Sequence, residues 1–148
     1  MEIIVIEYCH PIWIECFDEK EKVKMIDFKN GSIFKLSKNK VVSHASTIQP
    51  IMVNGETIIA EYTAVRDFVV FTNKRIIAVN VQGLTGKKKD FTSLPYSKIQ
   101  AFSVETAGVL DLDSELEIYF SSIGKVKFEF KGACDIAEIG KMISTHIL

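Results

Sequence analysis

The stretch from Arg66 to Gly108 constrains the fold of this chain most strongly. It contains three apolar runs of the kind that form β-strands, separated by turn residues: Phe68–Phe71, Ile76–Val81 and Ile99–Val104. None of these runs has the three- to four-residue spacing of apolar positions that marks a helix, so the stretch predicts a small antiparallel β-meander. It contains nothing that resembles a catalytic or cofactor site, and it therefore constrains the fold far better than the function.

The clearest two-residue period lies between residues 115 and 130. Two apolar series alternate with polar residues on either side of a turn at 121–124: Leu116, Ile118 and Phe120, then Val126, Phe128 and Phe130. This alternation predicts a β-hairpin with one face in the core. On the other face Glu115 and Glu117 are set against Lys125 and Lys127. Such cross-strand pairs contribute roughly 0.2–1 kcal/mol each, so they help to fix the register.

The last fifteen or so residues have the spacing of a helix. Asp135 precedes Glu138 by three residues, which is the arrangement of a capping box with aspartate in place of serine or threonine. The apolar stripe consists of Ile136, Ile139, Ile143 and Ile147. Burying four isoleucines is worth about 6–12 kcal/mol at most, against about 1 kcal/mol for the cap, so we expect docking on the strands to hold this helix in place.

Several longer segments carry a family resemblance: FTNKRII, QGLTGKKKDF, LPYSKI and FSVETAG, followed by DLDSELEIYF. Together they resemble the bacterial pleckstrin-homology (PH) domains, over about 25–148. The resemblance implies a mainly β fold, a PH-like seven-stranded antiparallel barrel of two roughly orthogonal sheets, capped by a C-terminal helix. It also implies a non-enzymatic module and ring-like homo-oligomers.

Composition is that of one ordinary domain. The chain has 148 residues, of which 47% are hydrophobic and 25% charged, so it can bury a core without disulfides or metals. A formal net charge of −1 provides no field that would attract nucleic acid. Three cysteines without framework spacing indicate free thiols in a reducing compartment, and we expect a cytoplasmic protein.

The predicted organisation has three parts: an N-terminal extension (1–24), an N-terminal arm or short helix (25–54), and the barrel with its helix (55–148). Two interpretations of the extension are open, an added β-hairpin or a translation start at Met25. Its acidic residues and lack of a basic segment fit neither a signal peptide nor a membrane span. In the arm, Asn30-Gly31 predicts a turn, Val41–Met52 a short helix ending near Pro50, and Thr57–Val65 is the first predicted barrel strand.

Catalytic, cofactor and metal sites are not predicted. The sequence has no histidine or cysteine between Ala45 and Ala133, which removes the usual triad and thiol chemistry from the barrel. The three histidines are too scattered for a metal cluster. The acidic run DLDSELE has leucine where a calcium-binding loop needs glycine, and QGLTGKK lacks the full phosphate-loop pattern.

The strongest candidate for partner or anion contact is a basic set: Lys74 and Arg75, then Lys87, Lys88 and Lys89. A lysine or arginine near an anionic membrane contributes about 1 kcal/mol, so five would reach little better than millimolar affinity. An ordinary solvated loop is the competing interpretation. The loop that holds phosphoinositides in eukaryotic PH domains corresponds to Ala64–Phe68, which offers only Arg66, so we expect no headgroup site here.

These observations favour a cytoplasmic, non-enzymatic interaction module that assembles with copies of itself. A partly open barrel exposes strand edges, and a small net charge does little to keep subunits apart. The alternative is a weak binding module for anionic lipid or peptide that acts through the lysine loop. An unknown protein partner fits either hypothesis.

Overall fold

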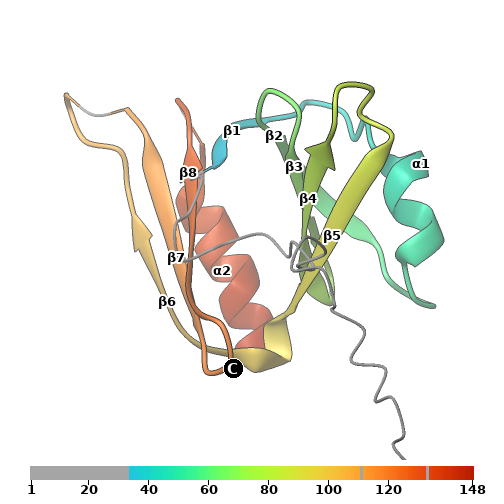
Figure 1. Cartoon of the computed structure of the whole chain (residues 1–148). Helices are drawn as coiled ribbons and strands as arrows, with labels where there is room; N and C mark the ends of the chain where they lie inside the picture. The colour runs from blue at the N-terminus through green and yellow to red at the C-terminus, as the bar shows by residue number, and fades with distance from the viewer. Residues whose placement is uncertain (1–33, 111, 133) are drawn as a thin grey trace, which may run out of the picture.

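The computed structural model describes residues 34–110, 112–132 and 134–148. The elements follow one another in the order β1 Phe34–Lys38, α1 Ala45–Ile48, η1 Gln49–Ile51, β2 Ile58–Thr63, β3 Phe68–Thr72, β4 Arg75–Gln82, β5 Lys88–Pro95, η2 Tyr96–Lys98, β6 Ile99–Glu105, β7 Ser114–Phe120, β8 Gly124–Phe130 and α2 Ile136–Ile147 (Figure 1). The interpretations of the extension 1–24 and of the turn at Asn30-Gly31 lie outside the described residues.

The eight strands form one hydrogen-bonded series in the order β5-β4-β3-β2-β1-β8-β7-β6. Strands β2 to β5 form one antiparallel meander and β6 to β8 form another. Strand β1 joins them, because it pairs antiparallel with β2 and parallel with β8. In Figure 1 the two meanders face each other, with α2 in the opening between them. The series ends at β5 and β6, so the barrel is partly open.

Strands β2 to β8 and helix α2 confirm the PH-like architecture that the family resemblance implied. The structure differs by an eighth strand, β1, which lies in the segment predicted as an arm. Leu36 of this strand is buried. The sequence shows an apolar/polar alternation over Ser32–Leu36, but it carries no signal for the pairing of this strand with both β2 and β8. The helix predicted within Val41–Met52 is confirmed in shorter form by α1 and η1, with Pro50 in η1.

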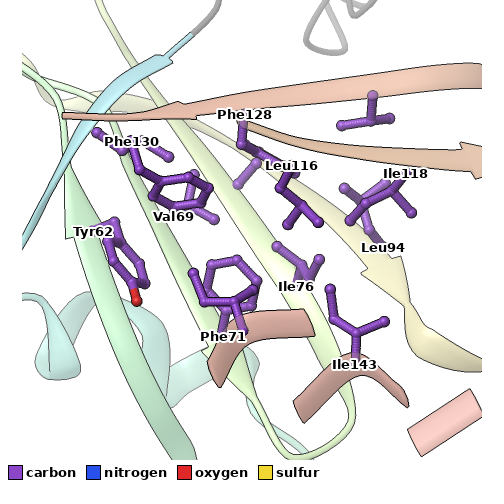
Figure 2. Packing of buried hydrophobic residues seen from close by; sticks show 14 of the residues in the cluster. Tyr62, Val69, Phe71, Ile76, Leu94, Leu116, Ile118, Phe128, Phe130 and Ile143 are labelled. Atoms are coloured by element: carbon purple, nitrogen blue, oxygen red, sulfur yellow. The ribbon is translucent and has the colours of Figure 1, made fainter. Parts of the chain in front are cut away.

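The main core fills the space between the two meanders. Val69, Phe71 and Ile76 come from one side and meet Leu116 and Phe128 from the other (Figure 2). All five side chains have at most 1% of their surface exposed. Both meanders therefore contribute one inward face, as the predicted alternation of the 115–130 hairpin requires.

A second, smaller core lies on the outer face of the first meander. Ile48 of α1 packs with Phe68, Val70, Ile77 and Val79, with further apolar contacts from η1. This explains why β3 is buried at every position, since a strand covered on both faces needs a continuous apolar run.

The C-terminal helix docks as predicted. The Glu138 backbone N–H donates to Asp135 Oδ1 at 3.1 Å, which confirms the predicted N-cap. Ile136, Ile139 and Ile143 are buried in the main core. Close approach of the helix to β6 occurs at Gly140, where a Cβ atom would lie 3.1 Å from the Val104 Cγ2 atom.

Candidate interaction surfaces

Strand β4 separates the predicted basic set into two groups. Lys74 and Arg75 lie where β4 begins, whereas Lys87, Lys88 and Lys89 follow the turn after its end. A strand of eight residues is about 25 Å long. The five side chains therefore do not form one cluster, and each group has to be considered separately.

Arg75 is occupied by an internal ion pair. Its Nε atom lies 2.9 Å from Glu56 Oε1, and the Glu56 side chain has no exposed surface. A second guanidinium nitrogen donates to the Ile51 carbonyl. Burial raises the pKa of the Glu56 carboxyl, but hydrogen bonds from Arg75, the Val53 N–H and Thr72 outweigh it and leave this pKa below its ordinary value. Arg75 therefore tethers the segment between η1 and β2 to β4.

The Lys74 ammonium donates to the Asn54 carbonyl at 3.2 Å. Lys87, Lys88 and Lys89 are exposed, and within the described residues their ammonium groups have no ion-pair or hydrogen-bond partner. Of the predicted basic set, these three lysines are the ones available for a partner. Binding by them stays a prediction.

The turn that precedes these lysines is fixed to the β2–β3 connection. Arg66 donates through Nη2 to the Gly83 carbonyl, and Asp67 Oδ1 accepts from the Val81 N–H at 2.8 Å. Gly83 has a φ of 72°, the left-handed conformation that glycine adopts without strain. Arg66 is the one basic residue of Ala64–Phe68, the loop in which we expect no headgroup site. Its guanidinium holds this turn in place.

Apolar side chains are fully exposed at the tips of three connections at this end of the molecule. Val65 lies between β2 and β3, Leu84 between β4 and β5, and Val109 and Leu110 between β6 and β7. Figure 1 places these three connections at the same end. Exposed apolar side chains at one end of a molecule are candidates for a contact surface.

The two terminal strands of the series differ in how their open edges are protected. Strand β5 carries Lys88, Lys89 and Pro95, which are residues that discourage further strand pairing. Strand β6 exposes Ala101 and Ser103, with no lysine or proline along its length. Its open edge is therefore the better template for an added strand.

A buried carboxylate organises the connection between β1 and α1. Glu61 Oε1 accepts from Asn39 Nδ2, from Ser43 Oγ at 2.7 Å and from the Ser43 N–H, and lies 2.8 Å from His44 Nδ1; Oε2 accepts from the His44 N–H at 3.0 Å. Burial raises the pKa of this carboxyl, but the donated hydrogen bonds outweigh it and leave it lowered. The His44 ring also stacks on Phe68, with centroids 4.0 Å apart.

This group brings serine, histidine and glutamate together, yet it does not have the geometry of a catalytic triad. Ser43 Oγ and Glu61 Oε1 both lie against the same ring nitrogen of His44, whereas a triad uses opposite nitrogens for the nucleophile and the acid. Cys134 is no better a nucleophile, because burial raises the pKa of its thiol. The Ser43–His44–Glu61 cluster ties the β1–α1 connection to β2, and we call it the latch.

Within the residues that the structure describes, no group of three or more His, Cys, Asp or Glu side chains could hold a metal ion. Across the same residues, no helix is long and apolar enough to span a membrane.

The strand order, the C-terminal helix and the main core define a barrel of the PH class. A structure of this class, a DUF1696 family protein with a pleckstrin-homology domain from Shewanella loihica, superposes with a TM-score of 0.67 at 37% identity and covers 78% of this chain and 99% of that one. The model of the bacterial PH domain family matches residues 27–147. The chain belongs to the bacterial PH domain family.

Two relatives come from Bacillus subtilis. The uncharacterized protein YjqA is 48% identical over 96 residues, which span 64% of this chain and 77% of YjqA. The uncharacterized protein YozO is 31% identical over 115 residues, which span 78% of this chain and 96% of YozO. Both relatives are uncharacterized, so they attach no ligand or reaction to this chain.

Proposed function

We propose that this chain is a non-catalytic interaction module that assembles into a closed homo-oligomer, in which β6 of one copy pairs with β5 of the next. The open β6 edge carries the proposal. Exposed strand edges recruit further strands unless they are protected. Pairing between two different edges is heterologous, so it continues from copy to copy and closes into a ring when the rotation allows.

Charge complementarity supports the same pairing. In an antiparallel arrangement the end of β6 lies beside the beginning of β5, so Glu105 of one copy approaches Lys88 and Lys89 of the next. Opposite charges across a strand pair are favourable, and like charges are unfavourable. Lys88 and Lys89 oppose pairing of β5 with most strand edges, but they would favour pairing with the β6 edge that carries Glu105. These two predicted contact residues would then have Glu105 of the next copy as their partner.

Sedimentation velocity at micromolar concentration tests the proposal. We expect a discrete species larger than a dimer, which Glu105→Lys converts to smaller species. Combining Glu105→Lys with Lys88→Glu and Lys89→Glu should restore the assembly, because the charges are exchanged across the contact. Glu138→Lys is the control, since it makes the same charge change at an exposed side chain of α2. A wild-type protein that is monomeric throughout, or an assembly indifferent to Glu105→Lys, contradicts the proposal.

A second candidate function is docking on an anionic membrane, and the exposed loop tips favour it. Leu84 lies in the same β4–β5 connection as Lys87, and Val65 lies in the β2–β3 connection that Arg66 fixes to that turn. One end of the molecule thus combines apolar insertion with cationic attraction. The lysines alone give millimolar affinity at best, and burial of two apolar tips adds to this.

Vesicle co-sedimentation separates this candidate from the first. Binding to vesicles of phosphatidylserine and phosphatidylcholine should fall with Leu84→Ser at low and high salt, and with Lys87→Gln at low salt. Val53→Ser is the matched control, because Val53 is an exposed apolar residue near the opposite end of β4. Equal losses with Leu84→Ser and Val53→Ser would contradict membrane docking by this end.

A further inference from the structure

A cavity of about 270 Å³ lies where β1 leaves the sheet. The pairing of β1 with β2 ends at Lys38 opposite Tyr62, followed by one more hydrogen bond from the Asn39 N–H to the Glu61 carbonyl. From there the chain turns away toward α1. The first half of β2 is left facing the beginning of α2, and the cavity occupies the space between them.

The walls of this cavity are mainly apolar. Ile59 and Val42 are 49% and 38% exposed, and the cavity is completed on the α2 side by Ile139 and Met142. Ile59 sits at the irregularity in the β2–β3 pairing between Ile58 and Ala60. Two half-exposed aliphatic side chains at a concave site provide apolar contact for a ligand.

Of the charged side chains that line the cavity, both carboxylates have a partner, whereas one ammonium has none among the described residues. Glu61 has its carboxylate occupied by the latch described above, and Glu138 faces Lys38 at 3.8 Å. Lys40 lines the cavity, and among the described residues its ammonium has neither an ion-pair nor a hydrogen-bond partner. Lys38 lies at the same rim.

We propose that this cavity binds a small amphipathic carboxylate, with the carboxylate at Lys40 and the apolar body against Ile59, Ile139 and Met142. A free ammonium beside aliphatic walls selects one negative charge joined to an apolar chain. Glu61 lies in the wall and Lys38 is partly engaged, so the site disfavours polyanions such as phosphates. The volume is slightly below the range of drug-sized pockets, which matches a ligand of about ten non-hydrogen atoms.

Methyl NMR of the full chain, labelled at isoleucine and methionine methyl groups, tests this proposal with octanoate as the probe. We expect saturable shifts of the Ile59, Ile139 and Met142 signals, with a dissociation constant of about 1 mM. Ile77, which is buried in the second core, should not shift. Octanol, which has the same chain without the charge, should bind at least about threefold more weakly.

Two variants assign the charge contact. Lys40→Gln should weaken octanoate binding at least about threefold and leave octanol binding unchanged. Lys98→Gln changes an exposed lysine of η2 and should have no effect. Repeating the octanoate titration on the Glu105→Lys variant, which we expect not to assemble, makes the measured binding independent of assembly. Equal binding of octanol and octanoate, no effect of Lys40→Gln, or shifts confined to other methyl groups would overturn the proposal.

Discussion

Replacing Glu61 with glutamine tests whether the buried latch stabilises the fold. The carboxylate accepts hydrogen bonds from Asn39, Ser43 and His44, and its side chain has no exposed surface. Glutamine keeps one acceptor oxygen but presents an N–H₂ group to a backbone donor. A hydrogen bond to a buried charge is worth about 1.5–3 kcal/mol, and an unpaired buried donor adds a further penalty.

We therefore expect Glu61→Gln to lower the free energy of unfolding by about 3 kcal/mol at pH 7. In a domain of this size the melting temperature would fall by about 6–12 °C. Urea denaturation followed by circular dichroism measures the loss. Glu138→Gln is the matched control, because Glu138 is 71% exposed and its ion pair with Lys38 is long. That change should stay within about 0.5 kcal/mol.

The loss of stability caused by Glu61→Gln should also depend on pH. The pKa of Glu61 is lowered in the folded state, so its stabilisation is complete above the unfolded pKa of about 4.3 and is lost as the pH falls through the lower, folded value. The difference between wild type and Glu61→Gln should therefore shrink from pH 5 to pH 3. A loss no larger than that of Glu138→Gln, or one that grows toward acid pH, would refute the role of the latch.

Three further substitutions probe other contacts by urea unfolding. Arg75→Met should cost about 3–5 kcal/mol because it leaves the buried Glu56 carboxylate without its ion pair; unchanged stability would mean that Arg75 is free for partners. Asp135→Ala should cost about 1 kcal/mol through loss of the cap on the Glu138 N–H, and no change would show that packing alone fixes the start of α2. Ile143→Ala should cost about 2–5 kcal/mol, since this side chain is fully buried; a loss below 1 kcal/mol would contradict tight docking.

Much of the fold could be predicted from local patterns. The hairpin of β7 and β8 alternates between core and surface, and Lys125 and Lys127 pair with Glu117 and Glu115 as expected. The apolar stripe and the N-cap of α2 could be predicted from the sequence in the same way. In these segments the burial of each side chain follows from its position in a simple period.

Strand β5 could not be recognised as an apolar run. It pairs with β4 along its whole length, yet it begins with lysines, and its part-buried Asp90 and buried Thr92 are polar. One oxygen of each of these two residues is buried without a hydrogen-bond partner in the described part of the chain. A strand whose interior positions are partly polar has no apolar period to detect, so pairing with its neighbour decides its conformation.

The candidate sites were harder to predict because their members are distant in sequence. Glu56 meets Arg75, and Glu61 meets His44, across separate elements. Sequence spacing carries no signal for such pairs, which is why the sequence alone predicts Arg75 as a partner contact and gives no sign of its ion pair with Glu56. The exposed lysines after β4 were predictable, since three consecutive lysines beside a glycine turn cannot easily be buried.

The joining role of β1 has a consequence for the order of folding during synthesis. Its antiparallel partner β2 follows closely in the chain, but its parallel edge has no partner until β8 is made, because Phe34 pairs with Phe128. Contacts across such a sequence separation form slowly, and an open strand edge is an aggregation template in the meantime. The free edge of β1 is thus exposed to misassembly until β8 has emerged from the ribosome and paired with it.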